Sequence, residues 1–591
     1  MERDSLDRLS RIKQLALVAV VGVAALTGVV SCAWASEPAH NSEPAIASEL
    51  QARPIDLLTS HDHWQMEGAK YQSGKLVISA TNSSIVHQDG SPGIVNPPVN
   101  LFGTRLNVKG DFAINTTLTG VNATAEVSLY GKPPLIEDEE RAEEGTLDIK
   151  LYNNTFTAYV SDQQHGKNAE KLIKTIKPAG THTIRVADIG GNLNFTIDNK
   201  STGYMSDQGI FKSGNLWFGM DALSSGSKFD VTRLVAKGQG NGQVSVVDTR
   251  SLTIPHNSAE GFVALAQKVR PGFIVGAAVA PGPLVSDSTY RKILGENYNG
   301  ISIENASKFQ FIHPLPGNSP SDYNFSDMDG IVAMARKNGL KIHGHAIVFG
   351  EALPAWVQDI AKTNPSALKQ VLINHITTVA SHYKGEVDSW DLNELLADYD
   401  APAGTLGMRE NVWYKAMGPQ YAVIAAKALR AADPNAKICI NDFGMESDDD
   451  RFNQMIDLIK YLRDNGAQVD CVGFQAHIDD GDTNAADTHI DVAKLRSRIR
   501  TLAALGVKAR ISELDVSNTP SEYSVFGDVF EACLEEPNCS GVTTWGFTDE
   551  FSSAGNTTAN GIFEPGTGLP WNVYMQPTPA VADIEKALIS H

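Results

Sequence analysis

The stretch from residue 341 to residue 394 holds two strand-like runs with a helical pattern between them. It begins with KIHGHAIVF (341–349), continues through an amphipathic stretch at 365–382, and ends with EVDSWDLNE (386–394). An apolar strand, a helix and a second apolar strand in this order are typical of a βαβ unit, in which both strands lie parallel in one sheet. The stretch therefore predicts a parallel sheet with crossover helices.

The same alternation extends over residues 251–591. Further strand-like runs begin at Phe273, Tyr298, Lys437, Val469, Ala509 and Gly541, and helical patterns lie at 326–338, 411–432, 449–465, 491–505 and 522–534. Eight strands with intervening helices predict a (β/α)8 barrel. A doubly wound open sheet is the alternative, but no glycine-rich phosphate loop supports it.

Residues 50–237 show a different pattern. Short alternating runs such as FAINTTL (112–118) and THTIRVAD (181–188) are separated by Gly, Asn, Asp and Ser. Regular spacing of strands and turns predicts an antiparallel β-sandwich. In pattern alone it resembles concanavalin-like jelly rolls, and we expect a carbohydrate-binding or spacer module. A segment rich in Gly, Gln and Ser, 238–250, is expected to link the two domains.

The first 36 residues read as an export signal. Basic residues extend to Lys13, and an apolar run follows at 15–30. Ala-Trp-Ala at 33–35 fits a cleavage site that would release a soluble product, whereas the residues before Cys32 resemble a bacterial lipoprotein signal that would place a lipid on Cys32. Both alternatives predict an exported bacterial protein that is secreted, periplasmic or attached to the outer surface.

Composition and cysteine count narrow the possible partners. A net charge of -20 argues against nucleic acid as the main partner, and we expect a monomer. Of five cysteines, Cys533 and Cys539 are close enough in sequence to close a small surface loop. Cys439 and Cys471 begin strand-like runs and either bridge neighbouring strands or remain buried thiols.

Polar side chains close nearly every strand-like run of the predicted barrel. The chemistry of such barrels lies at the carboxyl ends of the strands. These ends carry Glu304 and Asn305, His345, Asn393 and Glu394, Asn441 and Asp442, Gln475 and His477, Glu513 and Asp515, and Trp545 and Asp549. Glycosidic bond hydrolysis needs two carboxyl groups on either side of the bond. Glu394 and Glu513, after the fourth and seventh strands, would face each other across the barrel mouth.

The order and spacing of these residues resemble glycoside hydrolase family 10, the endo-β-1,4-xylanases and their relatives, over residues 251–589. The motifs that carry the resemblance are Glu304-Asn305-x-x-Lys308, Gly344-His345, Asn393-Glu394, Gln475-x-His477, Glu513-Leu514-Asp515 and the Trp-Gly-x-x-Asp that starts at Trp545. The resemblance implies that Glu394 is the acid/base and Glu513 the nucleophile. It also implies that the substrate contacts are Glu304, Asn305, Lys308, His345, Asn393, Gln475, His477 and Trp545, and that no cofactor is needed. Cysteines occur in some relatives at the places of Cys439, Cys471, Cys533 and Cys539.

The sequence departs from the family pattern at five places. Phe349, Gly350 and Ala352 replace a tryptophan, a histidine and a glutamine, and Ser553 stands where a second tryptophan usually closes the cleft. The fourth strand, from Trp390 to Glu394, is one residue shorter than usual, which requires a bulge or a change of frame. These departures leave the catalytic pair in place but alter the walls around the sugar.

The resemblance implies a retaining enzyme that acts on xylan or a related β-linked plant or algal polysaccharide. A β-1,4-glucanase and a hydrolase of decorated xylan are alternatives within the same chemistry, and a catalytically weak surface glycan-binding protein is the alternative outside it. His343, His375 and His382 show no partners in sequence and are interpreted as core or surface histidines. No metal site is predicted, because no loop has the ligand spacing that calcium requires.

Overall fold

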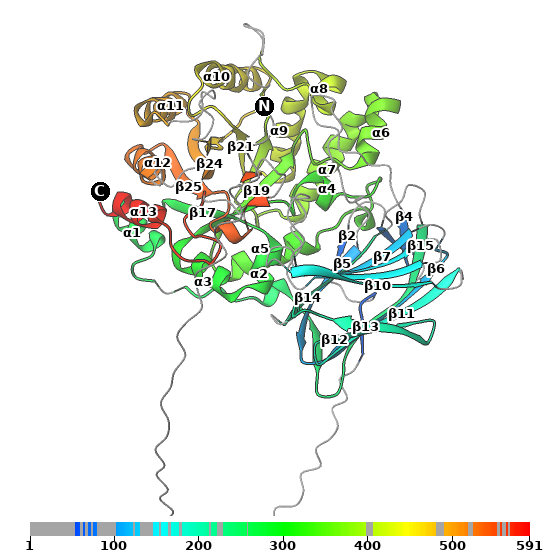
Figure 1. Ribbon diagram of the computed structural model, residues 1–591. Coiled ribbons are helices and arrows are strands. Elements are labelled where there is room, and N and C mark those ends of the chain that lie inside the picture. Colours follow the sequence, from blue (N-terminus) through cyan, green and yellow to red (C-terminus); the bar gives the residue numbers. More distant parts are fainter. Residues whose placement is uncertain are drawn as a thin grey trace, which may run out of the picture. The chain divides into compact units, whose positions relative to one another are not determined.

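The computed structural model (Figure 1) describes residues 54–590, with gaps. The gaps are 59–62, 66–68, 73–74, 80–101, 122–123, 131–145, 153–154, 163–166, 176–179, 212–213, 222–227, 257, 397–405, 480–489, 518–523, 552–555, 558–562 and 565–567. The predicted export signal, with Cys32, and Ser553 lie outside the described residues. In the part of the chain described, no helix is both long enough and apolar enough to cross a membrane.

Residues 55–246 form two antiparallel sheets that share one hydrophobic core. The strand order is β13-β12-β11-β6-β15-β4-β3 in one sheet, where β1 also pairs with β15, and β10-β9-β8-β7-β14-β5-β16 in the other, where β2 also pairs with β5. The strands are β1 (Ile55–Asp56), β2 (His63–Gln65), β3 (Ala69–Gln72), β4 (Lys75–Ser79), β5 (Phe102–Lys109), β6 (Phe112–Thr119), β7 (Thr124–Tyr130), β8 (Thr146–Tyr152), β9 (Thr155–Asp162), β10 (Lys167–Thr175), β11 (Thr181–Ile189), β12 (Asn192–Ile197), β13 (Lys200–Ser206), β14 (Asn215–Asp221), β15 (Lys228–Gly238) and β16 (Gln243–Val246). Alternating burial along β12, with Leu193, Phe195 and Ile197 inward, is the pattern of a sheet with one face in the core. The sandwich is thus the architecture that the alternating sequence predicted.

The segment expected as a linker differs from that expectation. Within 238–250, Gln243–Val246 forms β16, which pairs with β5 through Val244 and Val108. The residues of β16 alternate between polar and β-branched apolar, which is a strand pattern. The glycines just before β16 led to the prediction of a linker, so this strand was not predicted.

Residues 274–544 contain eight parallel strands that close into a barrel. They are β17 (Ile274–Val279), β18 (Gly300–Ile303), β19 (Lys341–Val348), β20 (Ser389–Asn393), β21 (Lys437–Asp442), β22 (Cys471–Phe474), β24 (Lys508–Ser517) and β25 (Cys539–Thr544). Pairing of β22 with β24 closes the ring, and the short β23 (His477–Asp479) extends the edge beside β24. The predicted (β/α)8 barrel is confirmed.

Helices surround these strands, as Figure 1 shows for α10 to α13 around β24 and β25. They are α1 (Phe262–Val269), α2 (Pro281–Ser286), α3 (Ser288–Asn297), α4 (Phe309–Ile312), α5 (Ser326–Lys337), α6 (Ala355–Thr363), α7 (Leu368–His382), α8 (Val412–Met417), α9 (Gln420–Ala432), α10 (Asp449–Asp464), α11 (Val492–Ala504), α12 (Ser524–Glu535) and α13 (Pro579–Ile589). The single helix expected at 411–432 is two, because Gly418 has a φ of 59° and ends α8. The strands β26 (Asn556–Thr557) and β27 (Phe563–Glu564) form a separate two-stranded antiparallel sheet.

The short fourth strand is accommodated by an irregularity beside it. The pair Gly344 and Trp390 is followed by the pair Val348 and Leu392, so β19 uses four residues where β20 uses two. On its other side β20 pairs with β21 without a shift. Trp390 is fully buried, and a methyl group on Gly344 would lie 2.3 Å from its ring. Trp390 therefore belongs to the core of the barrel.

Two disulfides join the four predicted cysteines. Cys439 on β21 bonds Cys471 on β22, its register partner, over a sequence separation of 32. Cys533 bonds Cys539 over a separation of 6, between α12 and β25. The first bond ties two neighbouring barrel strands, and the second closes a local loop.

Candidate active site

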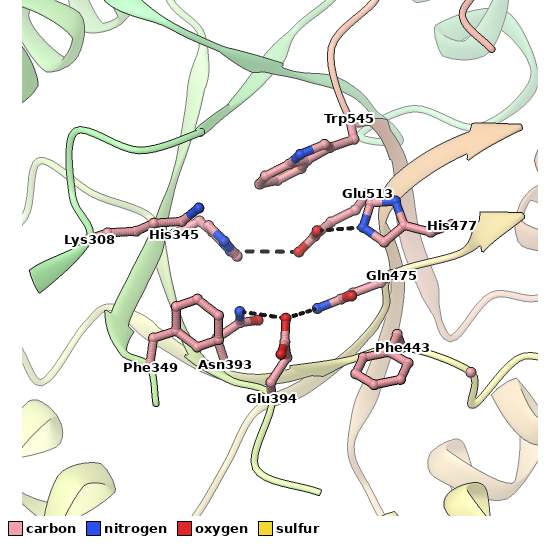
Figure 2. A pocket seen from close by; sticks show the side chains of 11 residues that line it. Lys308, His345, Phe349, Asn393, Glu394, Phe443, Gln475, His477, Glu513 and Trp545 are labelled. Carbon is pink, nitrogen blue, oxygen red and sulfur yellow. Dashed lines mark hydrogen bonds and ion pairs between the residues drawn. The ribbon is translucent and has the colours of Figure 1, made fainter. Parts of the chain in front are cut away.

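A pocket of about 400 Å³ opens where the parallel strands end. It is lined by Lys308, His345, Phe349, Asn393, Glu394, Phe443, Gly444, Gln475, His477, Glu513 and Trp545. These residues come from the strands β19, β20, β23 and β24 and from segments that follow the barrel strands. Figure 2 shows the carboxyl groups of Glu394 and Glu513 on opposite sides of the same space.

Glu513 lies on β24, and three neighbours hold its carboxylate. Asn441 donates a hydrogen bond to Oε1. His477 Nε2 lies 3.0 Å from Oε2, and His345 Nδ1 lies 3.6 Å from Oε1 (Figure 2). Burial alone would raise the pKa of Glu513, but the two histidines outweigh burial and hold the pKa below its ordinary value. Glu513 is therefore ionised at neutral pH.

Each of these histidines is anchored by a second carboxylate. His477 Nδ1 lies 2.9 Å from Asp515 Oδ2, and His345 Nδ1 lies 3.1 Å from Asp391 Oδ2. Burial lowers the pKa of His477, yet Asp515 and Glu513 together raise it well above its ordinary value. His477 is thus a cation, and its charge faces the carboxylate of Glu513.

A third histidine completes the layer beneath the pocket. His343 Nε2 lies 2.7 Å from Asp391 Oδ2, and His343 Nδ1 lies 2.6 Å from Ser389 Oγ. His343 is therefore a buried histidine with partners, in agreement with its interpretation as a core histidine. The strand period places it two residues before His345 on the same face, where both imidazoles reach one aspartate.

Glu394 follows β20 and has a quite different environment. Its Oε2 lies 2.7 Å from Nη1 of Arg409, and its Oε1 lies 3.3 Å from Gln475 Nε2 and 3.4 Å from Asn393 Nδ2. Burial raises the pKa of Glu394 to about 7, with Arg409 opposing the rise and Asp442 adding to it. At neutral pH this carboxyl is therefore divided between its acid and its base form.

Asn441 connects the two glutamates. Its Nδ2 donates both to Glu513 Oε1 and, over 3.0 Å, to Asn393 Oδ1, the residue next to Glu394. Its Oδ1 accepts a 2.5 Å hydrogen bond from Ser512 Oγ. Asn441 is fully buried, so this amide fixes the nucleophile and the acid/base segment relative to each other.

Aromatic side chains form the walls of the pocket. Figure 2 shows Trp545 on the Glu513 side and Phe349 and Phe443 flanking Glu394. The Trp545 ring meets His345 edge to face at 4.9 Å between centroids. A methyl group on Gly350 would lie 2.7 Å from Asn411 Nδ2, so a larger residue next to Phe349 would have to displace Asn411.

Most of the residues predicted from sequence meet in this pocket. Lys308, His345, Asn393, Glu394, Gln475, His477, Glu513 and Trp545 line it. Glu304 and Asn305 follow β18 but are not among the lining residues. Arg409 was missed, because it stands on no strand end and only the fold brings it to Glu394. No sequence signal near Glu394 marks it.

Clustered ligand-type side chains lie under the pocket. His345, Asp391 and Glu513 each bring one atom within 4.8 Å of the others, a spacing that could hold an ion. A second group includes Cys439, whose sulfur is bonded to Cys471. In the first group His345 Nδ1 already lies 3.1 Å from Asp391 Oδ2 and 3.6 Å from Glu513 Oε1.

The mouth of this closed (β/α)8 barrel places Glu513, which is ionised, opposite Glu394, which has a pKa of about 7. This arrangement defines a glycoside hydrolase. The chain belongs to glycosyl hydrolase family 10, whose family model matches residues 264–587.

Named relatives and a solved structure accompany that match. The chain is 32% identical over 316 residues to endo-1,4-beta-xylanase A of Phanerodontia chrysosporium. The aligned region covers 52% of this chain and 72% of that protein. It is 31% identical over 273 residues to endo-1,4-beta-xylanase B of Thermotoga neapolitana, covering 44% of this chain and 74% of that protein. Native xylanase 10B from Thermotoga maritima is 30% identical, with a TM-score of 0.49 over 56% of this chain and 98% of that one.

Proposed function

We propose that the chain is a retaining endo-1,4-β-xylanase, in which Glu394 is the acid/base and Glu513 the nucleophile. The observation that carries the proposal is that two glutamates on opposite sides of one pocket have pKa values shifted in opposite directions. Glu513 is held ionised by His477 and His345, while Glu394 titrates at about 7. A pair of carboxyl groups whose environments separate their pKa values is the arrangement that assigns an acid and a nucleophile.

The first half of the reaction uses Glu394 as an acid. Its proton passes to the glycosidic oxygen as the bond from that oxygen to the anomeric carbon breaks, and Glu513 Oε forms a bond to the same carbon. In the second half the Glu394 carboxylate takes a proton from water. The water oxygen then bonds to the anomeric carbon as Glu513 leaves, so two inversions give net retention.

The neighbouring residues support the assignment of each role. Asn441, His477 and His345 fix the direction of the Glu513 carboxylate, which lowers the cost of orienting it for attack. Asn393 is held by Asn441 beside the pocket and is proposed to bind the sugar 2-hydroxyl. Lys308, Gln475 and Trp545 are proposed as further sugar contacts, together with Glu304 and Asn305, which follow β18.

The sugar preference rests on the relatives and on the changed walls. Both relatives named above are endo-1,4-β-xylanases. Phe349 in place of a tryptophan and Gly350 beside it reduce the bulk on the Glu394 side of the pocket. We therefore propose xylan, including xylan with side groups, as the substrate.

The test measures reducing sugar released from xylan, mixed-linkage glucan and cellulose. We expect turnover of xylan, loss of that turnover in Glu513→Ala, and no change in Glu260→Ala, which removes an exposed glutamate. Proton NMR of the first product should show the β-anomer before mutarotation. Binding of xylan without turnover by the wild type would refute the enzyme assignment and favour the glycan-binding alternative.

We further propose that the protein is exported by residues 1–36 and that its sandwich binds glycan. Basic, apolar and small residues in that order support export. Radiolabelled palmitate incorporated by the wild type but not by Cys32→Ala would support the lipoprotein alternative. A soluble product that begins after Ala35 would support the other.

A further inference from the structure

The guanidinium of Arg409 is fixed in place next to Glu394. Its backbone N–H donates to the carbonyl of Leu395 over 2.9 Å, and its Nε donates to the carbonyl of Leu396 over 3.2 Å. Its side chain is only 7% exposed, and its Nη1 lies 2.7 Å from Glu394 Oε2. The cation thus has little freedom to leave the carboxyl that it contacts.

The same nitrogen of Arg409 also faces a second carboxylate. Glu351 Oε1 lies 3.4 Å from Nη1, and the Glu351 side chain is 42% exposed. Glu351 belongs to the segment after β19, which is tied to the segment after Arg409. Trp413 Nε1 donates to the carbonyl of Phe349 over 2.8 Å. One buried cation is therefore shared by a buried glutamate of the pocket and a glutamate in contact with water.

The charged groups that act on Glu394 come from four separate segments. They are Arg409, Asp442 on β21, Glu351 after β19 and Glu513 on β24. Asp442 is itself paired with Arg451 at 2.6 Å, and Glu513 lies 3.6 Å from His345 Nδ1 and 3.0 Å from His477 Nε2. Of these four side chains, Glu351 is the one that solvent reaches, whereas Arg409, Asp442 and Glu513 are buried.

The acid/base must change its charge within one catalytic cycle. When Glu394 is neutral, Arg409 gains more from Glu351, and when Glu394 has lost its proton, Arg409 gains more from Glu394. We propose that Glu351 and Arg409 are positioning residues that set the protonation of Glu394, with Arg409 exchanging its stronger contact between the two carboxylates in each half-reaction. This inference rests on the proposed function, because it assigns Glu394 as the acid/base.

The sign of each effect follows from the charges. Arg409 favours the ionised form of Glu394, so its removal should raise the pKa of Glu394 above about 7. Glu351 disfavours the ionised form, so its removal should lower that pKa. Because cleavage needs the protonated acid, the alkaline limb of kcat/KM reports this pKa and should move in opposite directions in the two variants.

The experiment compares pH profiles on xylo-oligosaccharides for the wild type, Glu351→Gln and Arg409→Met. We expect the alkaline limb to move down by about half a pH unit in Glu351→Gln and up by about 1 unit in Arg409→Met, since a close opposite charge shifts a pKa by about 1 to 3. Glu410→Gln removes the exposed charge next to Arg409 in sequence and should leave the limb in place. In the double variant, the Glu351 effect should shrink.

A second substrate separates the two halves of the reaction. With a dinitrophenyl xylobioside the leaving group needs no acid, so the rate reports the step in which Glu394 acts as a base. Arg409→Met should slow this step at neutral pH and move its acidic limb to higher pH, whereas Glu351→Gln should move that limb to lower pH. A general loss of structure would lower both rates without moving either limb.

Limbs that stay in place, or that move in the same direction in both variants, would overturn the inference. Glu351 is partly exposed, so its variant tests the idea even if Arg409→Met does not fold. Infrared titration of the Glu394 carboxyl, as the difference from Glu394→Gln, gives the same pKa shifts without turnover. If the carboxyl titrations shift but the wild type does not hydrolyse xylan, the proposed function alone is refuted. If the enzyme is active but the titrations do not shift, the inference alone is refuted.

Discussion

At the scale of single residues, one buried amide, that of Asn441, positions the groups that carry the chemistry. Asn441 directs Glu513 and positions Asn393 with the same nitrogen. An amide at this point can donate to a carboxylate, which neither an aspartate nor a leucine could do. The sequence placed Asn441 at a strand end but could not indicate which of its neighbours it would join.

We expect Asn441→Ala to lower kcat on xylan by roughly 10- to 100-fold, because a hydrogen bond to a charged group is worth about 1.5 to 3 kcal/mol. KM should change less than kcat, since Asn441 is not among the residues that line the pocket. Steady-state assays at the optimum pH would measure kcat and KM. Asn435→Ala, an exposed site, is the matched control. A rate equal to that of the wild type would show that His477 and His345 orient Glu513 without the amide.

Residues that meet through the barrel register could be predicted, and residues that arrive from elsewhere could not. Glu394, Gln475, His477 and Glu513 follow from strand ends, because parallel strands bring those ends to one rim. Arg409 comes from the segment after the gap at 397–405, and its position depends on the bridge between Leu396 and Met408. No periodicity encodes such a return of the chain.

At the scale of elements, the strands were predicted better than the connections between them. Strands of the barrel are buried on both faces and read as continuous apolar runs. The helices α1, α2, α3, α4, α6 and α13 and the strand β16 were not among the predicted elements. Of these, α2, α4 and β16 are so short that they carry few periodic residues. The displaced register between β19 and β20 was foreseen as a need for a bulge. Its place on β19 came only from the structure.

The two disulfides should contribute unequally to stability. Chain entropy predicts about 3 to 4 kcal/mol for the Cys439–Cys471 bond and about 2 kcal/mol for the Cys533–Cys539 bond, because the first closes the longer loop. We expect Cys439→Ala/Cys471→Ala to lower Tm more than Cys533→Ala/Cys539→Ala. Thermal unfolding with and without reductant would measure this. The reverse order would show that local strain or packing dominates over loop length.

At the scale of the whole molecule, the two domains have separate cores. The core of the sandwich draws its residues from Ile55 to Val246, and the core of the barrel draws its own from Leu252 to Leu588. No residue belongs to both clusters among those described. Each domain therefore has a hydrophobic core of its own.

Removal of residues 52–246 should leave the hydrolysis of soluble xylo-oligosaccharides unchanged and reduce binding to insoluble xylan. The cut must follow β16, because a cut at 237 would leave β16 attached to the barrel without β5, its partner in the second sheet. Turnover and pull-down assays measure the two properties. Tyr204→Ala offers a milder comparison, since this tyrosine is 74% exposed on β13 and could stack on a sugar. Failure of the shortened protein to fold would mean that the sandwich supports the barrel.

The bonds that brace the barrel lie away from the residues that do its chemistry. Arg270, before β17, donates to the carbonyls of Cys533, Glu536, Pro537 and Cys539, next to the shorter disulfide. The pocket is built from the opposite ends of the strands. Mutations can therefore accumulate around the sugar while the braced end preserves the fold. Phe349, which departs from the family pattern, lines this pocket, at the end of the barrel that the bonds of Arg270 do not brace.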